Sequence, residues 1–278
     1  MDGMKLVITG ASSGIGRALA SHFMSKGHLV WGIARSNQAQ FVADSKGKFF
    51  ASRCNVADWD NMQLAADEVR TAWGQIDCLI TCAGQLGEVG LAVTRVPHRW
   101  SDTVRVNLDG TYYSIRAFHE ALRQAGHRGK IVCFSGGGAT NGRPFFSAYG
   151  VSKAAVVRLV ETLAAELEDD NVDINAVAPG AINTRLLDEV LALGPTVVGK
   201  AEHEAAIKRK ASGGDSIEKT IALVEWLTTA KSDRISGRLF SAQWDNWKEL
   251  SAVSTELRNG DTFKLRRVLP GGDFWQAP

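Results

Sequence analysis

The stretch SAYGVSK, residues 147–153, places Tyr149 and Lys153 four positions apart among small, mostly uncharged residues. On a helix, positions i and i+4 share one face, with Cβ atoms about 5–6 Å apart. A neighbouring ammonium favours a phenolate, so this spacing predicts a pKa for Tyr149 below its usual value of about 10. Such a tyrosine could give a proton to a carbonyl oxygen or take one from an alcohol. The alternative is an ordinary pair on a helix surface.

A second chemical signal lies near the start of the chain, in KLVITGASSGIGRALA. An apolar run passes through Gly10, Gly14 and Gly16 into a helical pattern, which is the strand-turn-helix context of a dinucleotide site. Gly10 allows a tight turn, and the other two glycines let the backbone approach a pyrophosphate. The helix N-terminus would offer free N–H groups to that anion. The alternative is a tight turn that binds nothing.

The end of the second apolar run, WGIARS, bears on which dinucleotide would bind. An acidic residue at this point would accept hydrogen bonds from the ribose hydroxyls of NAD. Ala34 and Arg35 stand there instead, and a guanidinium can bind a 2′-phosphate bidentately. The sequence therefore predicts NADP(H) in preference to NAD(H). The alternative is that Arg35 is a solvated surface charge.

These residues need elements to position them, and the whole chain alternates short apolar runs with helical patterns. The predicted strands are KLVIT, HLVWGIA, KFFASRC, DCLITCA, KIVCFS, VDINAVA and GRLFSA. Helical periodicity covers residues 15–26, 58–73, 103–125, 148–169 and 217–230. This alternation predicts an α/β fold in which helices cover both faces of a seven-stranded parallel sheet. We expect one domain over residues 1–242, with a long insertion at 185–215 and a C-terminal extension at 243–278.

Composition narrows the class of partner. The 278 residues include 32 basic and 30 acidic side chains, a formal net charge of +2. Neither nucleic acid nor an anionic membrane is therefore expected, and a small molecule is favoured. No apolar run reaches membrane-spanning length and no secretory signal opens the chain, so we expect a cytoplasmic protein. The cysteines stand in apolar runs without C-x-x-C spacing, which predicts reduced thiols and no metal. They are Cys54, Cys78, Cys82 and Cys133.

Taken together, the motifs resemble the short-chain dehydrogenase/reductase family, in the compact branch whose turn reads T-G-x-x-x-G-x-G. The matching segments, spread over about residues 4–242, are TGASSGIG, CAG at 82–84, VNLDG around Asn107, YGVSK, and APGAINT at 178–184. The resemblance implies a doubly wound parallel sheet of the Rossmann type, a nicotinamide cofactor and reversible carbonyl/alcohol oxidoreduction. It also implies a homodimer or homotetramer.

The resemblance assigns roles by position. Tyr149 would be the general acid/base, Lys153 would lower its pKa and hold the nicotinamide ribose, and Asn107 would support a proton relay through a bound water. The residues expected at the cofactor are Gly10, Ser12, Ser13, Gly14, Ile15, Gly16, Arg35, Asn55, Val56, Cys82, Ala83, Gly84, Tyr149, Lys153, Pro179, Gly180, Ile182 and Thr184.

The chain departs from the family pattern at the serine that holds the substrate oxygen. Gly136 fills that position, and the nearest hydroxyl belongs to Ser135 in CFSGGGAT. A one-residue shift on a strand turns the side chain to the other face. We expect the permissive glycine run to present Ser135 to the substrate. Ser147, or backbone N–H groups of residues 136–138, are the alternatives.

Two further departures concern the cofactor. Asn55 replaces an aspartate that contacts the adenine amino group in the family, and its side-chain carbonyl can still accept that bond. Cys82 replaces the asparagine usual before "AG", which removes an expected hydrogen bond.

The insertion at 185–215 is where the resemblance places substrate specificity. Its apolar residues follow helical spacing and would form a lid or pack on the core, and Gly194 and Gly199 would be flexible points. These apolar residues are Leu186, Leu187, Val190 and Leu191. The predicted substrate is a 3-oxoacyl thioester or a keto-sugar. Sugar epimerisation is disfavoured by the compact turn spacing, and the alternative from another class is a non-catalytic NADP(H)-binding sensor or scaffold.

The C-terminal extension has unusual residues with two interpretations. Trp244 and Trp247 could wall the substrate site or, like Trp275, belong to a segment that contacts a neighbouring subunit. Arg266 and Arg267 could clamp a substrate phosphate or carboxylate, or lie at the surface.

Overall fold

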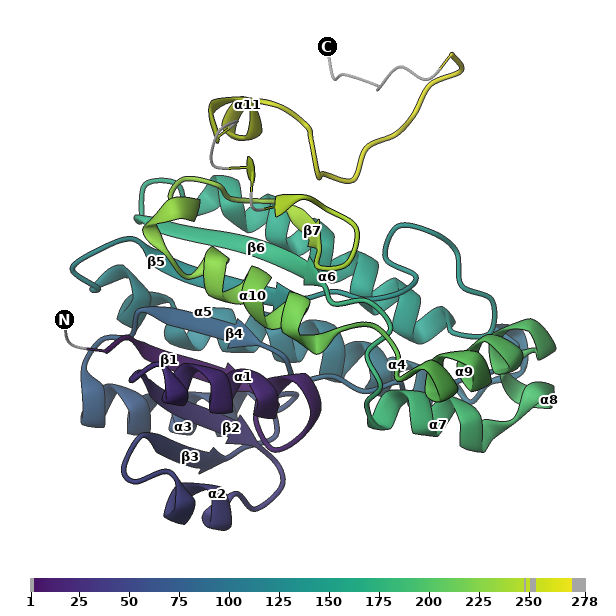
Figure 1. Ribbon diagram of the computed structural model, residues 1–278, viewed down its shortest axis with the longest axis horizontal. Helices are drawn as coiled ribbons and strands as arrows, with labels where there is room; N and C mark the ends of the chain where they lie inside the picture. Colours follow the sequence, from purple (N-terminus) through teal and green to yellow (C-terminus); the bar gives the residue numbers. More distant parts are fainter. Residues whose placement is uncertain (1–2, 248, 251–253, 272–278) are drawn as a thin grey trace.

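The predicted alternation of strands and helices is confirmed in the computed structural model, which describes residues 3–247, 249–250 and 254–271. The seven predicted strands form one parallel sheet in the order β3-β2-β1-β4-β5-β6-β7 (Figure 1). Between β3 and β4 the chain returns to the middle of the sheet, which places a switch point at the carboxyl ends of β1 and β4. The strands are β1 (Lys5–Thr9), β2 (Leu29–Ala34), β3 (Phe49–Arg53), β4 (Cys78–Thr81), β5 (Gly129–Phe134), β6 (Val172–Ala178) and β7 (Leu239–Ser241).

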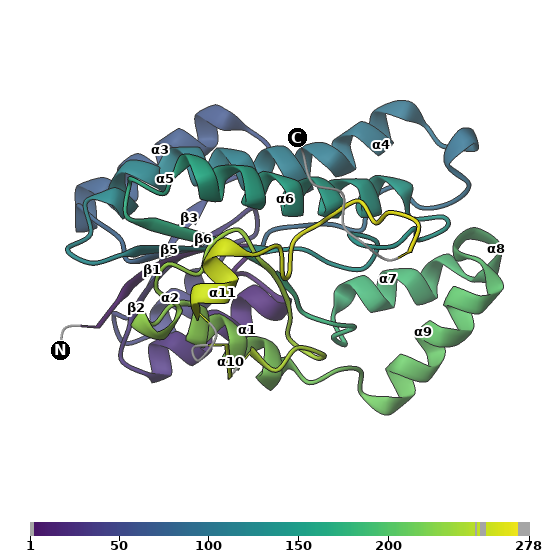
Figure 2. The same cartoon turned by 90° about the horizontal axis from the view of Figure 1, so that it is seen from above.

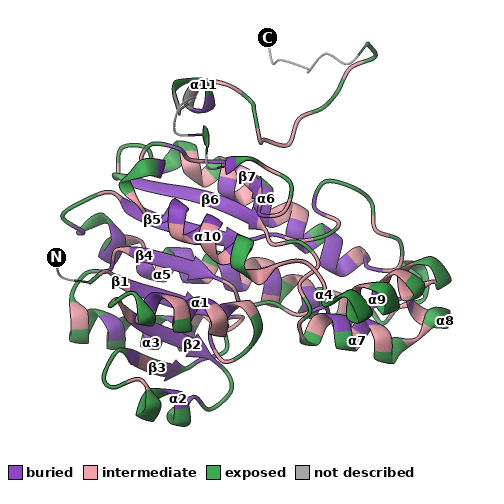
Figure 3. Ribbon diagram, in the orientation of Figure 1, coloured by how far each residue is buried: buried purple, intermediate pink, exposed green. Residues whose placement is uncertain are grey.

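Helices cover both faces of the sheet, which explains why the central strands are apolar throughout. Every residue of β4 and of β5 is buried, as expected for strands packed on two sides. The layers are clear when the molecule is seen from above (Figure 2). One apolar core lies under α3 (Trp59–Trp73), α5 (Gly110–Arg123) and α6 (Ser147–Glu166). The other lies under α1 (Gly14–Ser25), α2 (Ala39–Asp44) and α10 (Ile217–Leu227). Coloured by burial, the strands between the two helix layers are mostly buried, whereas exposed residues lie on the helices and loops (Figure 3).

The helix predicted over residues 103–125 is wrong in its limits. It is divided into α4 (Pro97–Val104), a π-helical turn η2 (Arg105–Asp109) and α5. Proline at the first helical position starts α4 six residues early, because its fixed φ suits a helix N-terminus. The π turn holds Asn107, and such bulges are frequent at functional sites. Helix α2 was not predicted, because only Phe41 of its six residues is buried and no apolar stripe results.

The insertion at 185–215 forms three helices at one end of the molecule. They are α7 (Arg185–Leu193), α8 (Pro195–Val198) and α9 (Lys200–Ser212), and the short 3-10 turns elsewhere are η1 (Ala92–Thr94) and η3 (Ala230–Ser232). Gly194 and Gly199 separate the three helices at φ of +73° and +86°, a region that glycine enters at little cost. Leu187 and Val190 are buried in a third apolar cluster, separate from the two cores of the sheet.

The extension after β7 returns across the sheet edge. Leu239 N donates to Phe263 O at 2.8 Å, and the rings of Phe240 and Phe263 are 5.2 Å apart. Trp247 is buried against Trp226. The buried guanidinium of Arg238 donates to the carbonyls of Leu257, Gly260 and Thr262, which fasten α11 (Ser254–Asn259) and the following turn. Trp275 lies outside the described residues.

All four cysteines are free, and three of them are buried. Among the described residues, no helix has the length and apolarity needed to cross a membrane. Nor does this part of the chain hold a cluster of three or more metal-ligating side chains.

Candidate active site

The glycine-rich turn sits at the switch point and is shaped by close backbone packing. Gly10 has φ +74°, and a Cβ there would be 2.8 Å from Ala83 Cα in the loop after β4. A Cβ at Gly16 would collide with the carbonyl oxygen of Gly10. The two glycines therefore let α1 pack onto the end of β1, as the sequence pattern predicts.

The N-terminus of α1 is open to an anion. Ser13 is its N-cap residue but its side chain makes no capping hydrogen bond, and the first turn has no acidic residue. The Gly16 N–H is directed at the Cys82 thiol. The free N–H groups and the helix dipole thus face the cavity beside the turn. Gly14 approaches Thr184 across it, since a Cβ at Gly14 would be 3.8 Å from Thr184 Cγ2. The glycine cradle and the N-terminus of α1 fit a dinucleotide pyrophosphate.

A single cavity of about 1220 Å³ joins this turn to the tyrosine–lysine pair. All residues predicted at the cofactor line it, and so does Ser135. Asn107 does not line it. Arg35 follows β2, lines the cavity and has an exposed side chain. Asn55 is exposed as well, and its Oδ1 accepts a hydrogen bond from Ala57 N at 3.3 Å.

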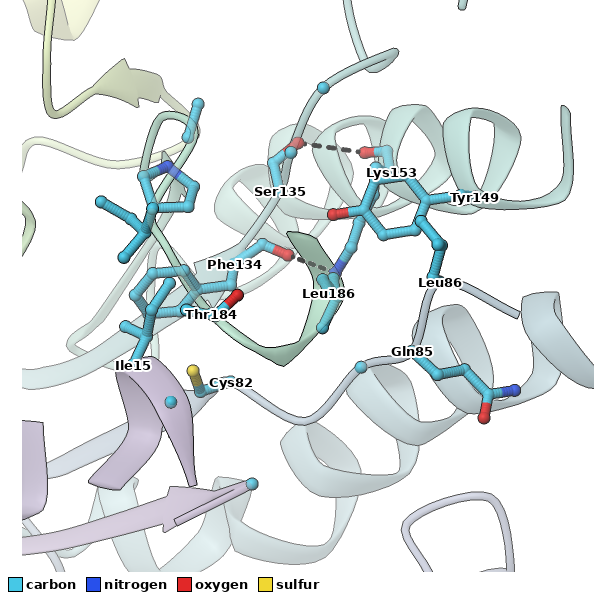
Figure 4. Close-up of a pocket in the computed structure, with 18 of the residues that line it drawn as sticks. Ile15, Cys82, Gln85, Leu86, Phe134, Ser135, Tyr149, Lys153, Thr184 and Leu186 are labelled. Atoms are coloured by element: carbon cyan, nitrogen blue, oxygen red, sulfur yellow. Dashed lines mark hydrogen bonds between the residues drawn. The ribbon is translucent and has the colours of Figure 1, made fainter. Parts of the chain in front are cut away.

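Tyr149 and Lys153 lie one turn apart on α6, both buried (Figure 4). Lys153 Nζ is 5.8 Å from the centre of the Tyr149 ring and donates to Phe134 O at 2.9 Å. Burial lowers the pKa of Lys153 to about 8. The sequence prediction of a lowered tyrosine pKa is wrong for this structure. Burial raises the pKa of Tyr149 and has the largest effect, while Arg143 opposes that rise.

Asn107 holds the loop after β4 in place beside the tyrosine–lysine pair. Its side chain donates to Gln85 O and Ser152 Oγ, both at 3.0 Å, and accepts from Gln85 N at 2.9 Å. A Cβ at Gly84 would be 3.3 Å from Asn107 Oδ1 and 3.4 Å from Lys153 Nζ. The amide therefore fixes the loop after β4 against α6, next to the lysine ammonium.

Gly136 leaves the position of the family serine without a side chain, and the Tyr149 hydroxyl lies close to this position. A Cβ at Gly136 would be 2.5 Å from Tyr149 Oη. Ser135 is buried and its Oγ donates to Lys153 O at 3.3 Å (Figure 4). Ser147 Oγ accepts from Trp100 Nε1 at 3.0 Å. Neither hydroxyl bonds to Tyr149 in the described structure, so which group holds the substrate oxygen stays a prediction.

Cys82 lines the cavity beside the glycine turn. Burial raises the pKa of its thiol to about 12, so it is neutral at physiological pH and unsuited to act as a nucleophile.

Two residues that the sequence did not reveal fix the loop after β6. Asp215 Oδ2 accepts from Ala181 N at 2.6 Å. Gln243 Nε2 donates to Pro179 O at 2.8 Å and to Ser216 O at 3.0 Å. Gly180, at φ +89°, is hemmed in by both, because a Cβ there would be 2.5 Å from Asp215 Oδ2 and from Gln243 Cγ. The insertion and the extension thus shape the predicted nicotinamide wall, although their segments carry no motif.

The side of the cavity next to Tyr149 is apolar on one wall and charged on another. Leu86, Leu187 and Val190 belong to the same apolar cluster as Tyr149, so residues of the insertion pack in the cluster that contains the phenol. Trp244 lines the cavity and is 85% exposed. The clamp suggested for Arg266 is wrong, because its guanidinium pairs with Glu161 and Asp261 outside the cavity.

Comparison with known proteins agrees with this geometry. A family model described as short chain dehydrogenase matches residues 5–192. The chain is 33% identical to short chain dehydrogenase mpl6 of Monascus purpureus, over 96% of this chain and 89% of that protein. It is 33% identical to a D-threitol dehydrogenase of Mycolicibacterium smegmatis, over 67% and 73%. The solved structure of Thermoplasma acidophilum aldohexose dehydrogenase aligns with a TM-score of 0.75, at 24% identity over 87% of this chain and 93% of that one.

Proposed function

The chain belongs to the short-chain dehydrogenase/reductase family, and from this premise we propose an NADP(H)-dependent oxidoreductase that interconverts a carbonyl and an alcohol. The observation that carries the proposal is one cavity that holds both the open N-terminus of α1 and the pair Tyr149 and Lys153. A bound nicotinamide would supply the hydride in reduction and accept it in oxidation.

Tyr149 is the proposed general acid/base. Because burial raises its pKa, the phenol is protonated at neutral pH and can donate to a carbonyl oxygen. The O–H bond breaks, the carbonyl oxygen becomes a hydroxyl, and a phenolate remains. Arg143 favours that phenolate, although burial has the larger effect on the tyrosine pKa. In the oxidative direction the phenolate takes the proton back from the alcohol.

Lys153 and Asn107 are proposed to serve the same proton. One N–H of the Lys153 ammonium is held by Phe134 O, and an ammonium has three donors, so two are left for a cofactor ribose or for water. Asn107 holds the loop that borders this ammonium. Ser135 remains the proposed partner of the substrate oxygen, with the N–H groups of residues 136–138 as the alternative.

NADP(H) is proposed over NAD(H) on the strength of Arg35. Its exposed side chain follows β2 at the rim of the cavity, and no acidic residue stands at 34–36. The Arg35→Met variant should raise the KM for NADPH about tenfold or more, because a charge-assisted bond to the 2′-phosphate is lost. The KM for NADH, measured on the same preparation, should stay within about twofold. A faster wild-type reaction with NADH would overturn this preference.

The substrate is proposed to be a 3-oxoacyl thioester or a keto-sugar. The names of two similar proteins, a D-threitol dehydrogenase and an aldohexose dehydrogenase, support a sugar or polyol. The apolar residues Leu86 and Leu187 beside Tyr149 support an acyl chain. A panel of both kinds, with simple ketones, distinguishes these classes.

The deciding experiment follows absorbance of the reduced nicotinamide with this panel for the wild type and for Tyr149→Phe. We expect turnover to fall by at least about 10²-fold in the variant, with the Kd for NADPH nearly unchanged. The exposed Tyr112 of α5, which does not line the cavity, provides the matched Tyr112→Phe control. Unchanged turnover in Tyr149→Phe would refute the mechanism. A wild type that binds NADPH but reduces nothing on the panel would favour the non-catalytic alternative.

We further propose a homodimer or homotetramer in the cytoplasm. Light scattering after size-exclusion chromatography measures the first, and cell fractionation measures the second.

A further inference from the structure

Three charged side chains meet in the wall of the cavity. Arg143 follows the glycine run after β5, while Glu202 and Arg209 belong to α9 of the insertion. Arg143 Nη2 and Arg209 Nη1 donate to the same carboxylate oxygen, Glu202 Oε1, at 2.7 and 3.2 Å. The side chains of Arg143, Glu202 and Arg209 are 22%, 22% and 31% exposed. We call these three residues the arginine pair and its carboxylate.

The charges of this group do not balance. Two guanidiniums face one carboxylate, which leaves one positive charge in a partly enclosed wall. Each guanidinium has five N–H donors, and the bonds to Glu202 use one nitrogen of each. Within the described residues, Arg143 Nε and Nη1 make no hydrogen bond. The guanidinium lies 3.9 Å above the Phe146 ring, which holds its plane in place.

Arg143 and Tyr149 both line the cavity beside the glycine run after β5. A Cβ at Gly137 would have Arg143 Nη1 as its nearest atom, at 3.6 Å, and a Cβ at Gly136 would meet Tyr149 Oη. The guanidinium and the phenol thus lie against neighbouring residues of one loop and line the same cavity, and Arg143 is close enough to the phenol to lower the pKa of Tyr149. A substrate whose carbonyl reaches Tyr149 would bring a group a few atoms away to Arg143.

We propose that the substrate carries an anionic oxygen group that binds at the arginine pair, so that the enzyme reduces a short keto acid in preference to the matched neutral ketone. This inference rests on the proposed function and adds the substrate's charge to it. A carboxylate fits the two parallel N–H groups of a guanidinium. Glu202 would hold the two arginines together and keep them aimed into the cavity before the substrate arrives. A phosphonate shares this chemistry and forms a separate arm of the test.

The test compares 3-oxobutanoate, 4-oxopentanoate and 5-oxohexanoate with their methyl esters and with 3-oxobutylphosphonate. Turnover with NADPH is measured for the wild type and for Arg143→Met, which keeps an apolar side chain over Phe146. For the preferred acid, kcat/KM should fall about 10- to 100-fold in the variant, the loss expected for one charge-assisted hydrogen bond. For the ester, kcat/KM should fall much less, because the ester loses only the effect of Arg143 on the Tyr149 phenolate.

Two further variants sharpen the result. Arg70→Met removes an exposed arginine that pairs with Asp67 on α3, away from the cavity. It should leave kcat/KM unchanged for the acid and for the ester. Glu202→Gln keeps a side-chain oxygen that can accept from both arginines but removes the opposing charge, so it should tighten binding of the acid severalfold without affecting the ester. Comparison of kcat/KM for the phosphonate with kcat/KM for the keto acids shows which anion the site prefers.

Equilibrium binding of acid and ester to the NADPH-bound protein separates this inference from the proposed function. If nothing is reduced but the acid binds more tightly than its ester, and Arg143→Met abolishes the difference, the proposed reaction fails and the anion site stands. If every acid and ester are bound and reduced equally, or if Arg143→Met weakens both alike, the arginine pair is structural and the inference is wrong.

Discussion

Gly136 offers the sharpest test of the site, because one methyl group placed there meets the Tyr149 hydroxyl. The Cβ would be 2.5 Å from Tyr149 Oη, about 0.9 Å closer than an ordinary contact, which begins at 3.4 Å. Gly136 is not among the glycines with positive φ, so Gly136→Ala and Gly136→Ser test space rather than backbone strain. The phenol is buried and must move by most of that overlap.

Displacing a catalytic group by about 1 Å can cost about 10²-fold in rate, and overpacking costs about 1–3 kcal/mol in the free energy of unfolding. We therefore expect Gly136→Ser to lower kcat/KM about 10²-fold. It should also lower the free energy of unfolding by about 1–3 kcal/mol, with the Kd for NADPH little changed. Steady-state kinetics and urea unfolding measure the two effects.

The neighbouring glycine gives the matched control for stability. A Cβ at Gly137 would be no closer than 3.6 Å to any neighbour, so Gly137→Ala should leave the free energy of unfolding within about 0.5 kcal/mol. In a Tyr149→Phe background the nearest atom to a Cβ at Gly136 becomes the ring Cζ at 3.3 Å. The two substitutions should then couple by about 1 kcal/mol. A stable Gly136→Ser variant with raised kcat/KM would refute the reasoning, since the family serine would fit after all.

Three further predictions concern charge, the cofactor loop and the extension. Burial lowers the pKa of Lys153 to about 8 in the folded protein, so between about pH 8 and 10.5 the unfolded chain binds one more proton. The free energy of unfolding should therefore rise with pH over this range, relative to Lys153→Met. Urea unfolding that showed this difference between wild type and variant falling with pH would contradict the prediction. Gln243→Leu removes one hydrogen bond to the loop after β6, at Pro179 O, and one to Ser216 O at the start of α10. The variant should weaken NADPH binding by roughly 5- to 50-fold. A Kd equal to the wild-type value in a fluorescence titration would exclude a role for the loop contact. Arg238→Met leaves three backbone carbonyls of the extension without the buried guanidinium that donates to them. The variant should lower the free energy of unfolding by roughly 2–4 kcal/mol and speed proteolysis after β7. Resistance to protease equal to that of the wild type would show that other contacts hold the extension.

Local patterns explain what the sequence could predict. The seven strands carry dense apolar runs, and the glycines of the turn and the spacing of Tyr149 and Lys153 are read directly from neighbouring residues. The structure confirms the parallel sheet and brings the predicted cofactor residues to one cavity.

Features that depend on distant segments were beyond such patterns. Arg143 and Glu202 are 59 residues apart, and Gln243 reaches Pro179 across 64. No periodicity links residues so far apart. The direction of the Tyr149 pKa was wrong for the same reason, because burial of the phenol is a tertiary property. The π turn around Asn107 escaped prediction because its residues continue an ordinary helical pattern.

The cover over β7 has a consequence for synthesis of the chain. Strand β6 ends at Ala178, its outer edge pairs with β7, and Leu239 N of β7 in turn donates to Phe263 O. At about 5–20 residues per second, the ribosome needs on the order of 5–15 s to deliver the roughly 85 intervening residues. During that time the nascent chain carries an apolar strand edge with open hydrogen-bonding groups, the kind of edge that recruits other chains. Chaperone demand should therefore be highest between completion of β6 and release of the extension.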